Sequence, residues 1–456
     1  MTSDRLLLGV GAAQAIALVI SVTFLTYVLV IVVPFLRCRR RTPGDSAGYG
    51  WHFFVPARDE EKVIGTTIGY LRGSFPTAHV WVIDDASTDT TGQIVADVAA
   101  CDDHVHVVSR RLPDARTGKG EALNVAYRQL DAWLPAGADR DRVIVGVVDA
   151  DGRPAADCLD VCAADHLFGD PDVSSVQVCV RMVNRDERRP FPHRGRYANA
   201  FGRTLVRLQD LEFRAAISAI QMNRRRTRTV GLGGNGQFSR LSALDDVRAA
   251  FGRPWHGALL EDYELSLHLL LTGHRNEYTD DTLVDQEGLP DFRRLLTQRT
   301  RWGQGTMQCG SYLPKLWSSR HVPTIGALEA AYYLLQPWLQ LVGTLVYPVP
   351  VGVLIYNFAA YPNIMTGWFA GGGWLLFLVY IVFGLGPFVA WGPIYVRRCE
   401  PQLGMVRGLA LGFAYAAFML TFYITSWRAF GRILRRRRDW AKTRRNAEFL
   451  PDSAAT

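Results

Sequence analysis

Apolar residues are concentrated at the two ends of this chain, whereas the middle alternates short apolar runs with amphipathic stretches. Residues 6–36 form an uncharged run that exceeds the roughly 20 residues a helix needs to cross the hydrocarbon core of a membrane. No small-residue cleavage site follows the run, and residues 37–41 contain four arginines. The pattern therefore predicts a membrane anchor and not a signal peptide, and the positive-inside bias predicts that Met1 faces outward.

Three further apolar stretches near the C-terminus predict a second membrane region. If all three crossed the bilayer, the basic tail at residues 435–445 would lie outside, against the positive-inside bias. Two arrangements avoid this conflict: one stretch lies in the interface as an amphipathic helix, or the first stretch, interrupted by Pro348 and Pro350, crosses twice. We expect a cytoplasmic tail, and the number of spans stays open. The stretches are residues 325–361, 368–396 and 408–430.

The middle of the chain predicts a parallel sheet covered by helices. Apolar runs typical of strands buried on both faces alternate with helix-like stretches, and this alternation is characteristic of α/β folds. Sheets of this kind bind ligands beyond the carboxyl ends of their strands, so polar motifs at those ends are candidates for a binding site. The predicted strands are residues 53–55, 79–83, 105–108 and 143–148, and the predicted helices are residues 61–71, 92–100 and 120–134.

Acidic residues follow the first two predicted strands. Asp59 comes after the first strand, and Asp84 and Asp85 come at the end of the second. A carboxylate at a strand end can accept hydrogen bonds from a base edge or a ribose hydroxyl, which suits a bound nucleotide. Asp59, Ser87 and Thr88 are equally well placed to cap the following helices, and both interpretations stay open.

The fourth predicted strand ends in Asp149 and Asp151, one residue apart. Two carboxylates this close at a buried strand end repel each other unless a cation neutralises them. Carboxylate oxygens favour Mg²⁺ or Mn²⁺, either of which can bridge a diphosphate. Lys119 lies between two glycines at the start of a predicted helix, where it can hold a diphosphate, although such a sequence also forms ordinary turns.

The charge distribution indicates a membrane surface and not nucleic acid as the partner. The chain has 51 Lys and Arg against 43 Asp and Glu, a formal net charge of +8. These basic residues cluster beside the apolar stretches, where they meet anionic headgroups, and no nucleic-acid-binding motif occurs. The seven cysteines include no Cys-x-x-Cys pair, which predicts free thiols.

Three more polar motifs follow in a fixed order: a glycine-rich segment at residues 231–237, Glu261-Asp262, and Gln298-x-x-Arg301-Trp302. With the acid pair at the fourth strand, the set resembles family 2 inverting glycosyltransferases. It is most similar to the membrane-integrated processive branch of cellulose, hyaluronan, chitin and poly-N-acetylglucosamine synthases. The resemblance covers roughly residues 49–308. It implies a GT-A type α/β fold, a mostly parallel sheet with helices on both faces, together with transmembrane and interfacial α-helices.

The resemblance also implies roles for individual residues. Asp262 would be the general base that deprotonates the acceptor hydroxyl. The glycine-rich segment would shape the acceptor side, although flexibility explains its glycines equally well. Asp59, Asp84, Asp85, Lys119, Asp149, Gln298 and Arg301 would bind the nucleotide-sugar, Asp149 and Asp151 the metal, and Trp302 and Glu261 the acceptor.

Elementary chemistry supports two of these roles. Asp262 begins an apolar helix, where desolvation raises a carboxylate pKa while the helix dipole lowers it, although an ordinary N-terminal helix acid has the same sequence. Guanidinium geometry at Arg301 fits a diphosphate, and an aromatic face at Trp302 fits the C–H side of a pyranose. Arginine and tryptophan also favour the membrane interface, which is the alternative interpretation of this pair.

The predicted function is transfer of a sugar from a UDP-sugar to a growing β-linked polysaccharide, with export through the membrane segments and possible export partner subunits. A single transfer to a lipid acceptor, either a polyprenyl phosphate or a diacylglycerol, is the alternative enzyme. A catalytically silent glycan-conducting subunit is a third. We expect a multi-pass plasma-membrane protein. The predicted regions are residues 1–41 (N-terminal transmembrane anchor), 49–290 (cytoplasmic GT-A domain), 291–322 (interfacial helices), 323–434 (C-terminal transmembrane region) and 435–456 (basic cytoplasmic tail).

Overall fold

An eight-stranded mixed sheet organises the middle of the chain in the computed structural model, which describes residues 2–437. The strand order is β3-β2-β1-β4-β7-β6-β8-β5. Six strands run in one direction, because only β7 and β5 pair antiparallel to their neighbours. The strands are β1 Gly50–Ala57, β2 His79–Asp85, β3 Val105–Arg110, β4 Val143–Val147, β5 Arg153–Pro154, β6 Val173–Met182, β7 Gln237–Arg240 and β8 Arg275–Gln286.

Helices cover both faces of this sheet, as the sequence predicted. On β1, Phe53 and Val55 point into one apolar core with α2 and α3, whereas Phe54 points into another core with α4, α8 and α9. This alternation follows from the two-residue period of a strand. The helices are α2 Ile64–Ser74, α3 Thr91–Ala99, α4 Lys119–Trp133, α5 Cys158–Cys162, α8 Leu241–Phe251 and α9 Glu261–Leu271.

One strand differs from its prediction. The sequence predicted that the third strand is buried on both faces, but β3 is an edge strand, and His106 and Val107 are half-buried. An edge strand has a neighbour on one side only, so its side chains receive less cover.

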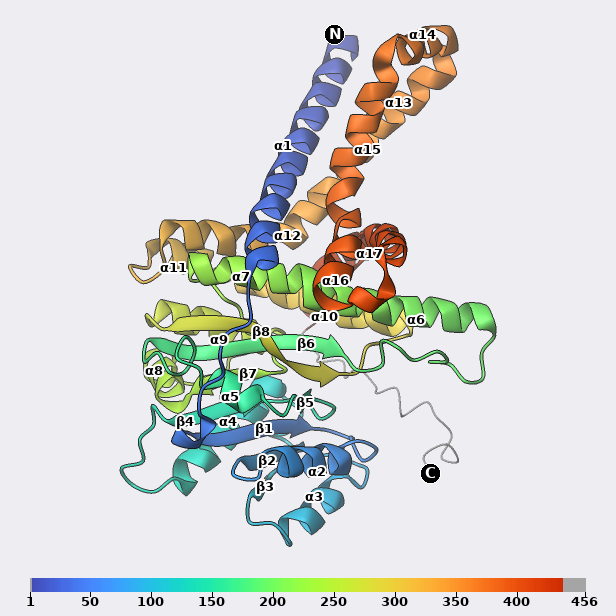
Figure 1. The fold of residues 1–456 in the computed structure, drawn as a ribbon. Helices are drawn as coiled ribbons and strands as arrows, with labels where there is room; N and C mark the ends of the chain where they lie inside the picture. The colour runs from blue at the N-terminus through green and yellow to red at the C-terminus, as the bar shows by residue number, and fades with distance from the viewer. Residues whose placement is uncertain (1, 438–456) are drawn as a thin grey trace.

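A second layer of helices lies between the sheet and an extended projection (Figure 1). Figure 1 shows α6 and α7 as a nearly continuous rod along the upper side of the sheet, with α10 beneath them. A π-helical turn, Glu212–Ile217, joins α6 to α7. Such π-bulges are frequent at functional sites. The helices are α6 Arg196–Leu211, α7 Ser218–Thr227, α10 Phe292–Cys309 and α11 Leu313–Ser318.

The projection consists of the apolar helices from both ends of the chain. Figure 1 shows α1, α13 and α15 extending away from the sheet, with α14 at the tip. α1 contacts both α13 and α15. The helices are α1 Thr2–Arg37, α12 Thr324–Val346, α13 Pro348–Ala360, α14 Pro362–Trp368, α15 Trp374–Val389, α16 Trp391–Cys399 and α17 Met405–Leu434.

Three helical segments of the described chain are long and apolar enough to cross a membrane: Leu18–Arg37, Thr324–Ala360 and Met405–Leu434. The third of these, α17, is seen nearly end-on in Figure 1 and runs across the direction of α1 and α15. Pro348 lies in the first turn of α13, and the chain continues from there to the tip without reversing. The chain therefore does not turn back at Pro348 and Pro350. Residues 438–456, most of the expected basic tail, lie outside the described residues.

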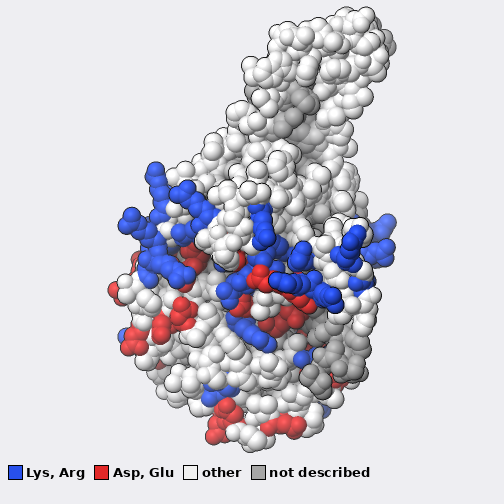
Figure 2. All heavy atoms as spheres, turned by 45° about the vertical axis from the view of Figure 1, so that its right-hand side comes forward, with Lys and Arg blue, Asp and Glu red and all other residues white. Residues whose placement is uncertain are grey.

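Charge separates the two regions of the molecule. Figure 2 shows Lys and Arg side chains gathered in a belt directly below a projection that carries no charged side chain on the visible face. Uncharged helices above a basic belt are typical of a membrane-inserted segment above its headgroup layer.

Candidate active site

A cavity of about 430 Å³ lies between the carboxyl-terminal side of the sheet and the helices α7, α10, α12 and α17. It brings together side chains from motifs that are far apart in the sequence. Asp59, Asp84 and Asp151 do not line it. The predicted site residues that do line it are Asp85, Lys119, Asp149, Glu261, Asp262, Gln298, Arg301 and Trp302.

Asp262 lies in the first turn of α9, and its Oδ1 accepts a hydrogen bond from the backbone N–H of Tyr263 at 2.7 Å. Burial and the neighbouring carboxylate of Glu261 raise the pKa of Asp262 to about 7, although the charges of Lys119 and Arg301 oppose this rise. A carboxylate with this pKa can accept a proton near neutral pH, which is what a general base must do.

Lys119 connects two of the acids. Its Nζ donates to Oδ1 of Asp149 at 2.8 Å and lies 3.8 Å from Oε1 of Glu261. Burial lowers the pKa of Lys119, but the two carboxylates outweigh burial and raise the pKa above its ordinary value. We expected Glu261 to bind the acceptor. In the structure it lies near Lys119, the same residue that contacts Asp149.

Asp149 and Asp151 follow β4 and are anchored by different residues. The N–H of Asp149 donates to Oδ1 of Asn235 at 3.2 Å, and Oδ2 of Asp151 accepts from the N–H of Glu287 at 3.1 Å. No group of three or more His, Cys, Asp or Glu side chains suited to a metal occurs among the described residues. Two carboxylates nevertheless suit Mg²⁺ or Mn²⁺ when phosphate oxygens and water complete the coordination.

Asp59 joins the loop after β1 to the loop after β2, and Asp84 fixes its own loop. Oδ1 of Asp59 accepts from the backbone N–H of Thr88 at 2.7 Å, and Oδ1 of Asp84 accepts from the N–H of Ser87 at 3.0 Å. Asp85 is buried in an ion pair with Arg110. The predicted capping role is not found, because neither α2 nor α3 has a side-chain cap. Asp59 and Asp84 fix loops instead, while Asp85 also faces the cavity.

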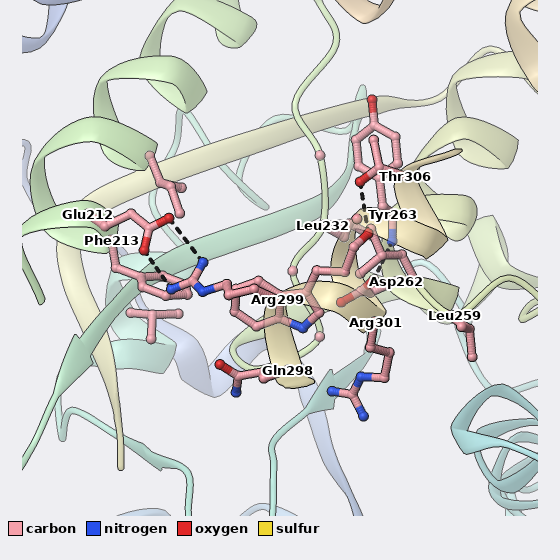
Figure 3. Close-up of a pocket in the computed structure, with 18 of the residues that line it drawn as sticks. Glu212, Phe213, Leu232, Leu259, Asp262, Tyr263, Gln298, Arg299, Arg301 and Thr306 are labelled. Atoms are coloured by element: carbon pink, nitrogen blue, oxygen red, sulfur yellow. Dashed lines mark hydrogen bonds and ion pairs between the residues drawn. The ribbon is translucent and has the colours of Figure 1, made fainter. Parts of the chain in front are cut away.

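The Gln-x-x-Arg-Trp motif lies on α10, which begins after the N-cap Asp291. Gln298, Arg301 and Trp302 are three and four residues apart, so they share one side of the helix. Figure 3 shows the two arginines of this segment pointing apart: Arg301 lies below Asp262, and Arg299 extends toward Glu212.

The pairing of Arg299 with Glu212 was not predicted. The two side chains form a buried bidentate ion pair, with Nη1–Oε1 at 3.0 Å and Nη2–Oε2 at 2.5 Å. Burial raises the pKa of Glu212, although Arg299 opposes this rise. The sequence offered one signal for this pair: Arg299 lies inside the Gln-x-x-Arg-Trp motif. It occupies one of the two positions that the motif leaves unspecified, so it was not singled out.

A second ion pair was also missed. Nε of Arg224 donates to Oε1 of Glu329 at 2.8 Å, and both side chains are buried. Glu329 is the only charged residue in the apolar stretch at 325–361. A lone carboxylate in such a stretch is a functional signal, because its burial requires a partner.

The glycine-rich segment packs directly against the proposed base. Gly234 has φ +77°, and a Cβ at this position would lie 2.8 Å from Oδ2 of Asp262. The neighbouring N–H of Gly233 donates to Oε1 of Gln177 at 2.7 Å, which fixes the segment. The glycine at 234 is therefore required by both its backbone conformation and its contact with the carboxylate.

The sequence model of a family described as "Glycosyltransferase like family 2" matches residues 50–305. A β-monoglucosyldiacylglycerol synthase from Nostoc sp. is 31% identical over 264 residues, which cover 56% of this chain and 48% of the relative. An undecaprenyl-phosphate mannosyltransferase from Micrococcus luteus is 36% identical over 98 residues, covering 22% of this chain and 36% of the relative. The chain thus spans about half the length of the first of these relatives.

A solved structure of the mannosyltransferase PcManGT from Pyrobaculum calidifontis, in complex with GDP-Man and Mn²⁺, has a similar fold. The TM-score is 0.57 at 18% sequence identity, and the match covers 92% of this chain and 99% of that chain. This likeness confirms the predicted GT-A type α/β fold with additional apolar helices.

We expect Asp262→Asn to lower kcat by roughly a hundredfold to ten-thousandfold while donor binding is retained, because the amide cannot accept a proton. In the unsubstituted protein, kcat should fall about tenfold per pH unit below about pH 7, because the raised pKa leaves Asp262 protonated there. Steady-state rates from pH 5 to 9 measure this limb. The exposed carboxylate variant Asp139→Asn is the control. A kcat that stays constant from pH 7 down to pH 5 would assign the base to another group.

We expect Gly234→Ala to lower activity at least about tenfold, because the added Cβ displaces the carboxylate of Asp262. Gly137→Ala is the matched control, since Gly137 also has a positive φ of 87° and an added Cβ there meets nothing within 4 Å. Both variants should lose about 1 kcal/mol of unfolding free energy from backbone strain. Equal activity in the two variants would contradict the contact with Asp262.

Proposed function

Since this chain belongs to the family 2 glycosyltransferases, we propose that it transfers a single sugar from a UDP-sugar to a lipid acceptor in the membrane. The sequence predicted a polysaccharide synthase first and a lipid transferase as the alternative. The relatives favour the lipid transferase, because the names of both contain a lipid, diacylglycerol in one and undecaprenyl phosphate in the other.

The observation that carries this proposal is the extent of the cavity. The same cavity is lined by Lys119 and Asp149 on the side of the sheet and by Gln336 and Phe422 on helices α12 and α17. Those two helices are among the candidate membrane-spanning segments. An acceptor held at the bilayer surface can therefore bring its reactive group to Asp262 without leaving the membrane.

The residues then have distinct tasks in a single in-line displacement. Asp262 removes the proton from the attacking acceptor group. Arg301 and Gln298 stabilise the charge that develops on the departing diphosphate. Trp302 offers an aromatic face to the transferred sugar or to the acceptor.

The acid pair after β4 suits a divalent cation, Mg²⁺ or Mn²⁺. Asp149 and Asp151 would hold it, and when bound it would neutralise charge on the diphosphate leaving group. Lys119, which contacts Asp149, supplies a further positive charge at the same place. The solved complex of PcManGT contains Mn²⁺ together with its nucleotide sugar, which agrees with this assignment.

We also propose a topology with the catalytic region in the cytoplasm. α1 leads from the far end of the projection to the sheet, the α12–α13 segment leads away from the sheet and α15 leads back, so the chain after α15 returns to the catalytic side. α17 then lies along the interface. This topology keeps the basic residues at 37–41 and 435–437 on one side of the membrane.

Product analysis tests the proposed function. We expect purified full-length protein, incubated with radiolabelled UDP-sugars, Mn²⁺ and membrane lipid, to give one organic-extractable species that carries a single sugar. The Asp262→Asn variant is the control for background transfer. A ladder or a high-mass polymer on chromatography would instead establish the polysaccharide synthase.

Metal removal tests the assignment of the acid pair. We expect excess chelator to abolish sugar transfer and added Mn²⁺ to restore it, because the diphosphate then lacks its counter-charge. Asp151→Ala should lose the response to Mn²⁺, while the exposed variant Asp165→Ala retains it. Full activity of the unsubstituted protein in chelator would contradict a metal role.

A further inference from the structure

The charges that line the acceptor side of the cavity indicate which kind of lipid fits there. Two arginines, Arg224 and Arg299, line the cavity on the side of the helices α12 and α17. A lipid that carries a phosphate needs cationic or N–H donors to bind it in a desolvated site. Whether these two guanidinium groups are already paired with carboxylates therefore decides whether a phosphate can bind there.

Arg299 is already paired. Both of its terminal nitrogens contact the carboxylate of Glu212, and the pair is buried, with Arg299 4% and Glu212 5% exposed. The guanidinium carbon lies 4.3 Å from the centre of the Trp302 ring, which covers one face of the group. Phe213 and Phe422 lie within 5.8 Å of it as well. The fork that would bind a phosphate in bidentate fashion is occupied by Glu212.

Arg224 is also paired with a buried carboxylate, but through Nε alone, and among the described residues its buried Nη2 has no hydrogen-bond partner. Its Nε contacts Glu329, whose other oxygen accepts from the hydroxyl of Thr229 at 2.9 Å. The ring of Tyr333 lies 4.3 Å from the guanidinium carbon. This pair links α7 to the membrane helix α12, so releasing Arg224 for a ligand would break a contact between two elements of the fold.

The remaining basic residues that line the cavity face acids near the donor site. Arg58 lies 3.7 Å from Asp59, and Lys119 contacts Asp149 and Glu261. The charge of Arg301 acts on Glu261 and Asp262. Each of the five basic residues that line the cavity, among those described, thus faces at least one carboxylate, and the donor diphosphate adds further negative charge.

The acceptor side instead offers neutral hydrogen-bonding groups. Gln336 and Gln340 lie one turn apart on α12, opposite Thr425 and Ser426 on α17. The hydroxyl of Ser426 donates to Oε1 of Gln340 at 2.5 Å. Amide and hydroxyl groups of this kind can bind the hydroxyl and ester oxygens of an uncharged headgroup.

We propose that the acceptor is an uncharged lipid with a free hydroxyl, of the diacylglycerol class, and not a lipid phosphate. This inference rests on the proposed lipid transferase function. A phosphate placed here would lie buried beside Glu212 or Glu329, and like charges in a desolvated site repel strongly. A hydroxyl avoids this repulsion.

The transfer step balances with a hydroxyl acceptor. Asp262 takes the hydroxyl proton as the acceptor oxygen forms a bond to the anomeric carbon of the sugar. The bond from that carbon to the diphosphate oxygen breaks, and the nucleoside diphosphate leaves with the electron pair. The products are the glycosylated lipid and the nucleoside diphosphate, with the proton on Asp262.

The experiment compares acceptors that differ only in a phosphate. Full-length protein in mixed micelles receives a radiolabelled UDP-sugar with either diacylglycerol or phosphatidic acid, and with either a polyprenol or the corresponding polyprenyl phosphate. We expect kcat/KM to be at least about tenfold higher for the uncharged member of each pair. Equal or faster use of the phosphate lipids would overturn the inference while leaving a lipid transferase. A polymer product would overturn both.

Charge variants provide the second readout. Glu212→Gln removes the charge that compensates Arg299, so we expect it to shift the ratio of uncharged to phosphate acceptor use toward phosphate by about tenfold. Glu212→Asp retains the charge and is the matched control, with an unchanged ratio. Thermal unfolding checks that both variants are folded. If Glu212→Gln does not fold, Glu329→Gln against Glu329→Asp tests the second pair in the same way. An unchanged ratio in a folded Gln variant would contradict the proposed role of the pair.

Discussion

Mutual compensation of buried charges is the constraint on which this structure depends. The cavity gathers carboxylates and guanidinium groups from segments far apart in sequence, and none of these groups is easily buried alone. Lys119 lies between Asp149 and Glu261, Arg299 is held by Glu212, and Arg224 is held by Glu329. Because each pair joins different elements, satisfying the charges also fixes the positions of the sheet, the interfacial helices and the membrane helices.

The apolar helices that are long enough to cross a membrane also contribute contacts to the site. Glu329 on α12 holds Arg224 and also accepts from the hydroxyl of Tyr27 on α1 at 3.2 Å. The guanidinium carbon of Arg224 lies 5.9 Å from the ring centre of Tyr263, the residue after the proposed base. A continuous set of contacts thus runs from the first helix of the projection to the catalytic centre. A catalytic region without α12 would lose both the carboxylate that compensates Arg224 and the Tyr333 ring that covers it.

Local sequence patterns were sufficient for the first four of the eight strands and for part of the site. The alternation of apolar runs and amphipathic stretches identified β1, β2 and β4 with the helices between them, because periodicity is a local property. Spacing along one helix grouped Gln298, Arg301 and Trp302 in the same way. The Arg299–Glu212 contact joins residues 87 positions apart, and no local pattern encodes such a pairing. The burial of α17 against α10 depends on tertiary packing for the same reason.

Helix geometry explains why one short motif contacts two sides of the cavity. Residues two apart on a helix point in nearly opposite directions, so Arg299 and Arg301 diverge, as Figure 3 shows. Residues three apart are neighbours, so Arg299 lies against Trp302 and its charge is covered by the indole ring. α10 can thus present Arg301 toward the acids of the donor side and Arg299 toward Phe422 of α17. Arg299, which the motif leaves unspecified, thus contacts both the indole of Trp302 and the ring of Phe422 on α17.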